Sequence, residues 1–479
     1  MTDILLIHPP YSWPNKSQPL GLAYIGAVLE QEGFGVEIID MSPLEMSVAD
    51  LGNILVEKAP KIVGISFMTP QYNSTVAILK LVKEVDERIK TIVGGAHASA
   101  LPEAMLEIEQ LDYVVIGEGE ITTKELVSVI LGKSDRKAEE IKGIGFVRNN
   151  KCIFTEVRPL MTDLDTVPFP AWHLLPMDRY SVESLGGERG ESVYPLLSSR
   201  GCPNRCIFCS SHVVFKRQFR ERSAANIVAE IEFLAKRYNA RQFDFVDDTV
   251  TVNKKRMVEL CEHLVSHHKN IRWLCNSRVN TVTPDLLKTM YKAGCRKVDF
   301  GVESGNPDIL KNIKKGITLE QAVDAHRWAR KAGLITSSFF MVGNLGEGPE
   351  HIRKTADFID ELETDYVSAT ITTPFPGTEL YSIADSQGWI YERDWSKYDT
   401  TAFISKDYKP VASNGTMSRE QLLEEYFFLN SRLLKRKFRQ KYGKYYLLNY
   451  RLYYREVFSR IRRLGIVSTL KLVLRLLKR

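Results

Sequence analysis

Three cysteines in one short segment have the clearest capacity for chemistry in this sequence. Cys202, Cys206 and Cys209 lie within eight residues, in the spacing C-x3-C-x2-C. Thiolate sulfur is the ligand that iron–sulfur clusters and zinc prefer. Three ligands rather than four are informative, because a [4Fe–4S] cluster held by three thiolates keeps one iron open to a small molecule. Phe208 precedes the third cysteine and could cover such a cluster or pack on its ligand.

Zinc is the alternative occupant of this segment. His212 follows Cys209 by three residues and could complete a Cys3His tetrahedron. Zinc knuckles, however, occur in short modules with small cores, whereas this segment joins an expected strand at 194–197 to a long amphipathic helix within an extended α/β pattern. The context therefore favours an iron–sulfur cluster over zinc.

The cysteine segment resembles the hallmark of the radical S-adenosylmethionine (SAM) enzymes, C-x3-C-x-aromatic-C after the first strand of a partial (β/α)6 barrel. The resemblance implies that Cys202, Cys206 and Cys209 bind a [4Fe–4S] cluster. It also implies that the amino and carboxylate groups of SAM chelate the open iron. Reduction of the cluster would then cleave SAM to methionine and a 5′-deoxyadenosyl radical.

Length and composition describe the protein that must position these thiols. A chain of 479 residues exceeds one ordinary core and predicts two or three domains. Its 44% hydrophobic and 26% charged residues are typical of a soluble globular protein. No apolar run is long enough to span a bilayer, and the N-terminus lacks a signal-peptide pattern. We therefore expect a cytoplasmic protein whose scattered cysteines are buried free thiols, namely Cys152, Cys261, Cys275 and Cys295.

Residues 1–140 alternate short apolar strands with amphipathic helices. Buried parallel strands are expected at 4–7, 36–39, 62–66, 91–93 and 113–116. Five such units predict an open, doubly wound α/β sheet of the flavodoxin or Rossmann kind. In these sheets ligands bind beyond the carboxyl ends of the strands, so the segments that follow the strands are candidate site residues.

The segments that follow these strands are unusual for plain connectors. They read HPP at 8–10, SFMTP at 66–70, GGAH at 94–97 and GEGE at 117–120. Glycine lets the backbone approach a ligand and expose its N–H groups, although each segment alone also fits a tight turn. Together they resemble the cobalamin-binding domain that precedes many radical SAM barrels. The resemblance implies cobalamin contacts from Pro9, Ser66, Met68, Thr69, Gly94, Gly95, His97, Gly117, Glu118 and Gly119.

One departure concerns the cobalt ligand. The D-x-H-x-x-G signature, whose histidine binds cobalt in methionine-synthase-type domains, is absent. We therefore expect His8 and His97 to be structural residues rather than cobalt ligands. The lower face of the cobalt would be open or covered by the loop at 67–72, and an uncoordinated lower face would favour transfer of an alkyl group.

A hairpin and a linker separate this region from a second α/β pattern. Residues 143–156 predict the hairpin, with Asn149-Asn150 as its turn, and 163–176 are rich in proline and aromatic residues. Strands expected at 194–198, 242–246, 271–276, 297–302, 335–342 and 367–371 predict a TIM-like partial (β/α)6 barrel. We assign 1–140 to the cobalamin-binding domain, 141–180 to the hairpin and linker, 181–405 to the barrel and 406–479 to a basic helical C-terminal region.

Polar residues follow the expected barrel strands, at the end where barrel active sites lie. Asp247 and Asp248 could hold an ammonium or a ribose hydroxyl, although a helix N-cap explains either acid equally well. The resemblance implies that Glu303 and Ser304 hold the ribose or amino acid end of SAM and that Arg278 pairs with its carboxylate. Residues 342–344, which include Gly343 and Asn344, would line the adenine together with Pro374.

The C-terminal region is basic and predicted to be helical from Arg419, with breaks near Gly443 and Gly465. Residues 431–479 contain sixteen Lys and Arg and one acidic residue, whereas the rest of the chain carries 49 basic and 58 acidic side chains. Residues 466–479 predict a basic amphipathic helix. Such a region can cap the barrel, lie on an anionic membrane or bind nucleic acid. The leucine-rich face favours the membrane over nucleic acid, and a cap is compatible with lipid contact.

Over residues 1–405 the motifs together resemble the cobalamin-binding radical SAM enzymes, which include methylases and the anaerobic magnesium-protoporphyrin ester cyclase. This implies a protein that positions two reactive cofactors and excludes water. In a methylase, one SAM methylates Co(I) cobalamin and a second yields the radical, which abstracts hydrogen from an unactivated carbon before that carbon takes the methyl group. We expect a low-potential electron donor of the flavodoxin or ferredoxin type.

Two other functions stay open. A cyclase-like enzyme would use both cofactors to form a ring or a C–C bond without net methyl transfer. A non-catalytic cobalamin or redox sensor would bind a partner through the basic tail, although a sensor needs no SAM site at the barrel mouth. The tail alone motivates a lipid-like or other hydrophobic substrate, met by peripheral contact at the inner face of the membrane.

Overall fold

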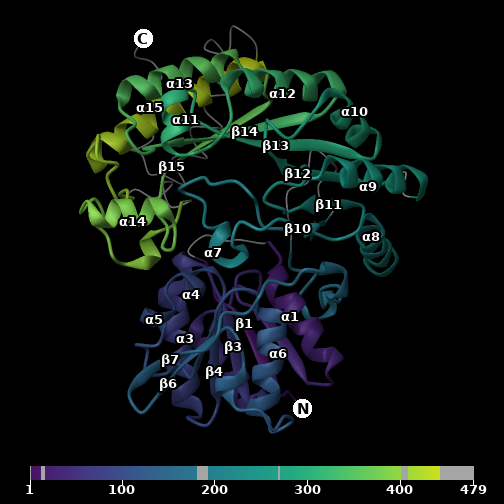
Figure 1. The fold of residues 1–479 in the computed structure, drawn as a ribbon, viewed down its shortest axis with the longest axis vertical. Helices are drawn as coiled ribbons and strands as arrows, with labels where there is room; N and C mark the ends of the chain where they lie inside the picture. The colour runs from purple at the N-terminus through teal and green to yellow at the C-terminus, as the bar shows by residue number, and fades with distance from the viewer. Residues whose placement is uncertain (1, 12–16, 181–191, 268–269, 401–407, 443–479) are drawn as a thin grey trace. The chain divides into compact units, whose positions relative to one another are not determined.

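The structure is a computed structural model that describes residues 2–11, 17–180, 192–267, 270–400 and 408–442. The chain divides into two compact units (Figure 1). Unit one comprises Met1–Pro203, Cys209–Val250 and Lys255–Trp273, and unit two comprises Asn204–Phe208, Thr251–Lys254 and Leu274–Arg479.

Unit one contains a seven-stranded sheet with the order β2-β1-β3-β4-β5-β6-β7. The first five strands are parallel and follow the flavodoxin-like order 2-1-3-4-5. The predicted doubly wound sheet is therefore confirmed. Its strands are β1 (Ile4–His8), β2 (Val36–Asp40), β3 (Ile62–Ser66), β4 (Lys90–Gly94), β5 (Tyr113–Val115), β6 (Ile144–Arg148) and β7 (Lys151–Phe154).

Helices cover both faces of this sheet (Figure 1). On one face, apolar residues of α2 and α3, among them Leu55 and Ile78, join Leu5 and Val63 of the strands in one buried core. On the other face, α1 packs against α6. The helices are α1 (Leu20–Gln31), α2 (Val48–Lys58), α3 (Tyr72–Val85), α4 (Ala96–Ala100), α5 (Pro102–Met105) and α6 (Gly119–Ile130), with the 3-10 turns η1 (Thr69–Gln71) and η2 (Ala138–Glu140).

The predicted hairpin is β6 and β7, and it extends the sheet antiparallel to β5. Asn149 and Asn150 both have positive φ, 50° and 58°, as a two-residue hairpin turn requires. The expectation that Cys152 is buried is wrong, because β7 is an edge strand and presents this residue to solvent. The other three cysteines outside the motif are buried as expected.

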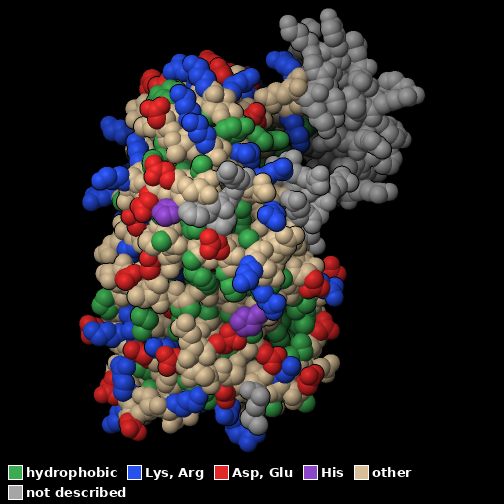
Figure 2. Space-filling model, turned by 90° about the vertical axis from the view of Figure 1, so that its right-hand side faces the viewer, with side chains coloured by type: hydrophobic (Ala, Val, Ile, Leu, Met, Phe, Trp, Pro, Cys, Tyr) green, Lys and Arg blue, Asp and Glu red, His purple; other side chains and the backbone are tan. Residues whose placement is uncertain are grey.

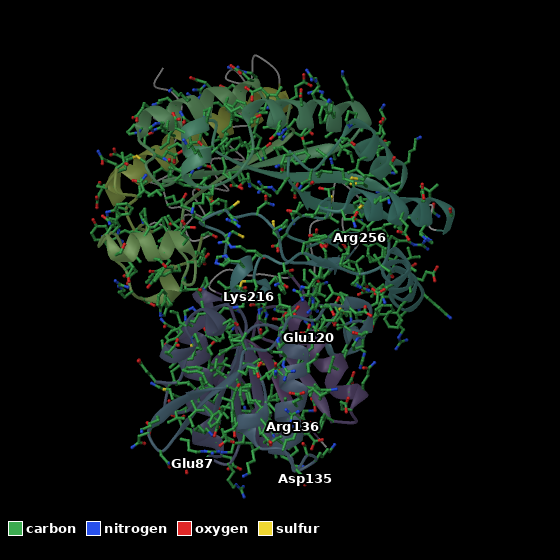
Figure 3. The ribbon with its side chains drawn as sticks, in the orientation of Figure 1. Glu87, Glu120, Asp135, Arg136, Lys216 and Arg256 are labelled. Carbon is green, nitrogen blue, oxygen red and sulfur yellow. The ribbon has the colours of Figure 1, made fainter. Side chains whose placement is uncertain are left out.

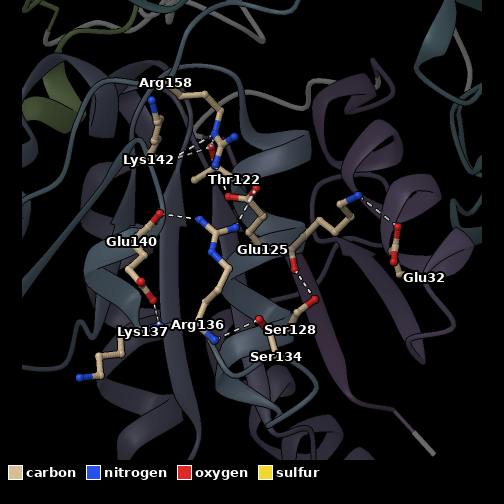
Figure 4. Close-up of polar contacts among 11 residues, drawn as sticks. Glu32, Thr122, Glu125, Ser128, Ser134, Arg136, Lys137, Glu140, Lys142 and Arg158 are labelled. Carbon is tan, nitrogen blue, oxygen red and sulfur yellow. Dashed lines mark hydrogen bonds and ion pairs between the residues drawn. The ribbon is translucent and has the colours of Figure 1, made fainter.

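Charged contacts hold the segment after the hairpin to α6 (Figure 4). Glu125 of α6 forms ion pairs with Arg158 and, at 3.3 Å, with Arg136. Arg158 also donates from Nε to Thr122 Oγ1 at 2.7 Å. Further along α6, Lys124 pairs with Glu32 after α1 at 3.1 Å, a half-exposed contact of the kind that stabilises a fold only weakly.

The segment around the cysteines also belongs largely to unit one. The long amphipathic helix expected directly after the cysteines is α8, but α7 and β10 come first. A short antiparallel pair of β9 and β10 encloses the cysteines in sequence. The elements are η3 (Leu164–Thr166), η4 (Trp172–Leu174), β8 (Val193–Leu196), β9 (Ser199–Arg200), α7 (Ser211–Phe215), β10 (Arg220–Glu221), α8 (Ala224–Tyr238), β11 (Gln242–Phe245) and α9 (Lys254–His267).

The second sheet has six strands in the order β15-β14-β13-β12-β11-β8, which confirms the six barrel strands predicted. In unit two, α10, α12 and α13 lie along one side of β13 and β14 (Figure 1). The remaining elements are β12 (Arg272–Ser277), α10 (Pro284–Lys292), β13 (Cys295–Glu303), α11 (Pro307–Asn312), α12 (Leu319–Ala332), β14 (Ile335–Val342), α13 (Pro349–Glu361), β15 (Tyr366–Ile371), α14 (Glu379–Ser386), η5 (Trp395–Lys397) and α15 (Arg419–Tyr442).

Helix α15 confirms the helix predicted from Arg419. It packs on α13 and β15, where Arg432 pairs with Asp357 at 2.8 Å and Arg436 donates to the carbonyl of Leu362 at 2.6 Å. Basic side chains of this helix therefore bind it to the barrel. The breaks near Gly443 and Gly465 and the helix at 466–479 lie outside the described residues. Within the described part, no helix combines the length and apolar character needed to cross a membrane.

One face of the described surface carries side chains of both charges. On the face shown in Figure 2, Lys and Arg are interspersed with Asp and Glu over the described residues.

Candidate functional site

A cavity of about 230 Å³ lies at the carboxyl ends of the parallel strands of unit one. Its walls are mostly apolar, and glycines form part of them. At Gly64, a Cβ atom would approach Leu6 Cδ2 to 2.8 Å. At Gly95, which has a φ of +95°, a Cβ atom would come within 2.7 Å of the carbonyl oxygen of Phe67. Larger residues would therefore narrow the cavity or displace its wall, and we call it the glycine-walled cavity.

Six of the residues expected to contact cobalamin line this cavity, and four do not. The six are Ser66, Gly94, Gly95, Gly117, Glu118 and Gly119. The other four, at the same end of the sheet, are Pro9, Met68, Thr69 and His97. The cavity is apolar, and its glycines let the backbone approach a ligand closely, so it suits a flat, largely apolar group. The six lining residues therefore fit the aromatic base of a cobalamin nucleotide tail.

Both histidines of this region contact neighbouring side chains of unit one. His97 is buried between the rings of Phe67 and Tyr72, and its Nδ1 bonds to Thr69 Oγ1 at 3.1 Å. Burial lowers the pKa of His97 to about 4, so the ring is neutral at physiological pH. His8 contacts Asp40 through Nδ1 at 2.9 Å and Gln71 through Nε2 at 3.3 Å. Both rings thus have contacts within unit one, and their exclusion as cobalt ligands stays a prediction.

The loop after β3 offers a different group to a ligand. Met68 exposes 55% of its surface at the end of this strand, while its backbone N–H is held by Gln71 Oε1 at 2.9 Å. Gln71 in turn donates to the carbonyl of Pro9 at 2.6 Å. The backbone of this loop is therefore fixed, and a thioether rather than an imidazole is its exposed side chain.

A buried ion cluster borders the glycine-walled cavity. Glu118 accepts from Arg200 at 2.9 Å and from Arg220 at 2.8 Å, and Arg200 also donates to Glu120 at 2.6 Å. Glu120 lies in the first turn of α6 (Figure 3). Burial alone would lower the pKa of Arg200, but the two carboxylates raise it. These contacts tie the GEGE turn to the two strands that enclose the cysteines in sequence, β9 and β10.

The first cysteine leaves β9 through a turn that requires glycine. Gly201 has a φ of +80°, and a Cβ atom there would collide with the carbonyl oxygen of Gln218. Cys202 Sγ lies 3.9 Å from Thr249 Oγ1. His212 Nδ1 bonds to the carbonyl of Cys209 at 2.7 Å, so this ring is committed to the loop backbone.

Within the described residues, no group of three or more His, Cys, Asp or Glu side chains is arranged around a single metal ion. A [4Fe–4S] cluster does not need such a group, because each of its thiolates binds a different iron. Three thiols spaced along one loop, with the histidine bonded to backbone, fit the donor set of such a cluster.

The two acids after β11 lie in different surroundings. Asp247 is buried and accepts from Ser198 Oγ at 2.8 Å and from Ser199 Oγ. It therefore fixes the segment that follows β8. Burial raises its pKa. Arg256 (Figure 3) donates to the carbonyl of Ser198 at 3.0 Å in the same cluster. Asp248 is exposed and accepts from Ser211 Oγ, which leaves it the more accessible of the pair.

In unit two, Cys206 has a cationic side chain beside its sulfur. Arg278, at the end of β12, donates from Nη1 to Cys206 Sγ at 3.6 Å and from Nη2 to the carbonyl of Lys315. Lys315 Nζ pairs with Glu303 Oε1 at 2.8 Å and lies 5.9 Å from the ring centroid of Phe208. The structure thus brings together Cys206, Phe208, Arg278 and Glu303, which the sequence named, and adds Lys315, which it did not.

Glu303 adopts an uncommon backbone conformation. Its φ is +74°, at a bulge where β13 pairs with β14. A Cβ atom at Gly301 would lie 2.5 Å from Glu303 Oε1, so the glycine makes room for the ion pair with Lys315. Ser304, by contrast, is fully buried and contacts Thr355 Oγ1 at 3.2 Å, on the side of α13.

The loop after β14 is held by a buried carboxyl group. Glu347 Oε2 accepts from the backbone N–H of Gly343 at 2.7 Å and of Asn344 at 3.1 Å. Burial raises the pKa of Glu347 to about 7. Asn414, from the segment before α15, donates to the carbonyl of Asn344 at 2.9 Å. Pro374 is buried in the loop after β15.

Several residues of the site gave no signal in the sequence. Lys315 lies in an ordinary basic stretch, Asn414 in a polar connector, and Arg200 and Arg220 have the charge pattern of surface residues. Each contributes through a contact with a residue far away in sequence, which spacing does not reveal. The two glutamates of the GEGE segment were the one sequence feature that could have indicated cationic partners for this site.

Comparison with known proteins identifies two matching regions. The radical SAM superfamily profile matches residues 196–359, and the B12 binding domain profile matches residues 12–127. An uncharacterized methyltransferase of Pyrococcus horikoshii is 35% identical over 410 residues, which cover 84% of this chain and 87% of the relative.

Two further proteins are similar over most of their length. The anaerobic magnesium-protoporphyrin IX monomethyl ester cyclase of Rubrivivax gelatinosus is 28% identical, with 92% of this chain and 80% of the relative covered. The structure of the radical SAM methyltransferase TsrM from Kitasatospora setae, with cobalamin and a [4Fe–4S] cluster bound, matches with a TM-score of 0.69. That match covers 91% of this chain and 89% of the other at 19% identity, so the likeness concerns the fold.

Proposed function

This chain belongs to the radical SAM superfamily, among the members that carry a B12-binding domain, and we propose that it methylates an unactivated carbon of a hydrophobic substrate. It is an enzyme of the cobalamin-dependent radical SAM methyltransferase class, with a [4Fe–4S] cluster, SAM and cobalamin as cofactors. When bound, cobalamin supplies a transferable methyl group, and the cluster supplies the electron that cleaves SAM. The residues of this chain bind these groups, orient them and exclude water.

The observation that supports a hydrophobic substrate is an exposed aromatic face on the sheet of unit two. Phe339 of β14 and Tyr366 of β15 expose 39% and 56% of their surfaces. Ser337 pairs with Tyr366 in a parallel ladder, so Phe339, two residues further on, lies on the same face as Tyr366. The opposite face is covered by helices, since Ser338 Oγ contacts His326 of α12 at 2.6 Å. Large apolar side chains exposed together favour an apolar ligand.

This aromatic face adjoins the residues beside the second cysteine. Phe339 pairs with Gly301, the glycine that makes room for the ion pair of Glu303 and Lys315. A substrate on Phe339 would therefore lie near the group proposed to hold SAM. We assign Glu303 to the amino or ribose end of SAM. We assign Asp248, the exposed acid after β11, to a polar contact with the same cofactor. Gly343, Asn344 and Pro374 are assigned to the adenine.

We also propose a place for cobalamin on the described residues. Its nucleotide base would occupy the glycine-walled cavity, and Met68 would cover the lower face of the corrin ring. The fixed backbone and exposed thioether of the loop after β3 support this assignment. Among hydrophobic substrates, the basic segment 431–479 favours a lipid, because such a segment is attracted to anionic membranes.

One relative supports a second candidate function. The cyclase of Rubrivivax gelatinosus is similar to 92% of this chain, and its name describes ring formation rather than methyl transfer. A cyclase-like reaction would use the same cysteines and cavity. The difference lies in whether a methyl group reaches the product.

The test uses the reconstituted full chain with deuteromethyl-labelled SAM, cobalamin and a low-potential reductant under anaerobic conditions. Host extract is divided into a lipid fraction and an aqueous fraction, and each is assayed by mass spectrometry. We expect label in a lipid-soluble product. We also expect Phe339→Ala to reduce that label, while Tyr291→Ala, a matched exposed aromatic on α10, leaves it unchanged.

Other outcomes would contradict specific parts of the proposal. Label in an aqueous product only would refute the hydrophobic substrate and keep methyl transfer. Substrate-dependent 5′-deoxyadenosine with no labelled product in either fraction would favour the cyclase-like reaction.

A further inference from the structure

The guanidinium of Arg278 is held on both sides of its contact with Cys206, by a backbone carbonyl on one side and by a side-chain amide on the other. Its Nη1 donates to Cys206 Sγ at 3.6 Å, its Nη2 donates to the carbonyl of Lys315, and its Nε contacts Asn280 Oδ1 at 3.4 Å. Asn280 also donates to the carbonyl of Gly316 at 3.1 Å. Arg278 exposes only 5% of its surface, so solvent does not compete for these bonds.

The same loop holds the backbone next to the cysteine. The N–H of Ile207 donates to the carbonyl of Ile313 at 3.1 Å, and the carbonyl of Ile207 accepts from Leu380 at 2.9 Å. Residues 313–316 thus fix both the peptide after Cys206 and the donor that faces its sulfur. The contact between guanidinium and sulfur is therefore built into the loop geometry and does not depend on a freely rotating side chain.

A hydrogen-bond donor beside the sulfur of Cys206 affects the reduction potential of a cluster bound there. With a cluster bound as proposed, the sulfur of Cys206 would be a thiolate ligand of iron, and it could still accept a hydrogen bond. The reduced cluster carries one more negative charge than the oxidised cluster. A buried cation that donates to a ligand sulfur stabilises the more negative state, and hydrogen bonds to sulfur are among the features that set cluster potentials.

We propose that Arg278 sets the reduction potential of the cluster by donating a charge-assisted hydrogen bond to the thiolate of Cys206. This role differs from the pairing with the SAM carboxylate that the sequence resemblance implied. The inference rests on the cofactor assignment of the proposed function, because it requires a cluster on Cys206. No new electron acceptor or donor is needed, since the step affected is the one-electron reduction that precedes SAM cleavage.

Two variants and two measurements test the proposal. Arg278→Gln removes the charge, and Arg278→Lys keeps the charge but loses the planar fork that reaches sulfur and carbonyl together. Arg272→Gln removes the same charge from the exposed start of the same strand and serves as the matched control. The potential is measured without SAM, by anaerobic redox titration followed by EPR. The Kd for SAM is measured separately on the oxidised protein.

We expect the potential of Arg278→Gln to shift to more negative values, with a smaller shift in the same direction for Arg278→Lys and none for Arg272→Gln. The Kd for SAM should stay close to that of the unchanged protein. An unchanged potential together with weakened SAM binding would overturn the proposal and assign Arg278 to the SAM carboxylate.

A measurement on the unchanged sequence covers the case in which Arg278→Gln fails to fold. Protein labelled with 15N-arginine should show a nitrogen coupling to the reduced cluster in pulsed EPR, and Arg278→Lys should lose it. Absence of that coupling in the unchanged protein would refute the hydrogen bond. If the unchanged protein formed no [4Fe–4S] cluster by iron, sulfide and EPR analysis, the cofactor assignment itself would fail, which is a distinguishable result.

Discussion

The glycine-walled cavity of unit one and the surroundings of Cys206 in unit two are built by different means. The cavity is shaped by backbone, and its critical positions are residues without a side chain, such as Gly64 and Gly95. The surroundings of Cys206 are shaped by long charged side chains, Arg278, Lys315 and Glu303, which are buried together. The wall of the cavity leaves space because side chains are missing there, whereas buried charged side chains face the sulfur of Cys206.

This difference predicts how each region responds to mutation. The backbone-defined wall of the cavity should be sensitive to added volume, because packed interiors tolerate extra atoms poorly, whereas the ion cluster of Glu118, Glu120 and Arg200 at its edge should be sensitive to loss of charge. A site defined by buried ion pairs should be sensitive to the loss of one partner, because the remaining charge is then uncompensated.

Cys206→Ala should abolish cluster binding and 5′-deoxyadenosine formation, because a cube bound by three thiolates would lose one of them. Cobalamin binding should persist, since the cavity shares no residue with this cysteine. Iron content, visible absorption and bound cobalamin measure the two effects together. Cys261→Ala is the control, a buried cysteine outside the motif. Loss of both cofactors in Cys206→Ala would show that the two regions are not independent.

Glu118→Gln should lower the free energy of unfolding by about 3–5 kcal/mol, because it leaves Arg200 and Arg220 buried without their shared charge. Urea denaturation of the apo protein measures this effect. Glu32→Gln breaks the half-exposed pair with Lys124 and should cost less than about 1 kcal/mol. Equal losses of unfolding free energy in the two variants would contradict the claim that burial makes the ion cluster at the cavity edge contribute more to stability than the half-exposed pair does.

Gly64→Val should weaken cobalamin binding and leave the cluster intact. Added volume at this position meets Leu6, and overpacking costs about 1–3 kcal/mol, which corresponds to roughly 5- to 150-fold in Kd. Equilibrium binding of cobalamin provides the measurement. Gly52→Ala in α2, outside the cavity lining, is the matched control and should not alter Kd, since helix interiors favour alanine. Unchanged affinity in Gly64→Val would place the cofactor elsewhere.

Glu347, which holds the loop after β14 in unit two, should make the free energy of unfolding depend on pH. Its folded pKa of about 7 lies above the unfolded value near 4.5, so the native state binds the extra proton. Stability from this group is present at low pH and falls as pH rises from about 4.5 to about 7. Urea midpoints at several pH values should show this slope, and Glu347→Gln should reduce it. An identical slope in the variant would remove Glu347 as its cause.

The two regions also differ in how much of them the sequence could predict. The positions of the strands along the chain, the hairpin turn at Asn149 and the position of the cysteines follow from local patterns of hydrophobicity and turn residues, and the structure has them where expected. The glycines of the cavity were visible as a repeated feature after strands. Lys315, Asn414 and Arg220 were not, because their roles depend on partners distant in sequence. Exposure of Cys152 was missed because edge position depends on strand order.

The central claim is that one chain uses both regions in one reaction that ends in methyl transfer. The most direct test quantifies 5′-deoxyadenosine and S-adenosylhomocysteine in the same anaerobic turnover, with the unchanged protein and with Cys206→Ala. We expect both products to form together when substrate is present, and we expect Cys206→Ala to form no 5′-deoxyadenosine. Substrate-dependent 5′-deoxyadenosine without S-adenosylhomocysteine would contradict methyl transfer.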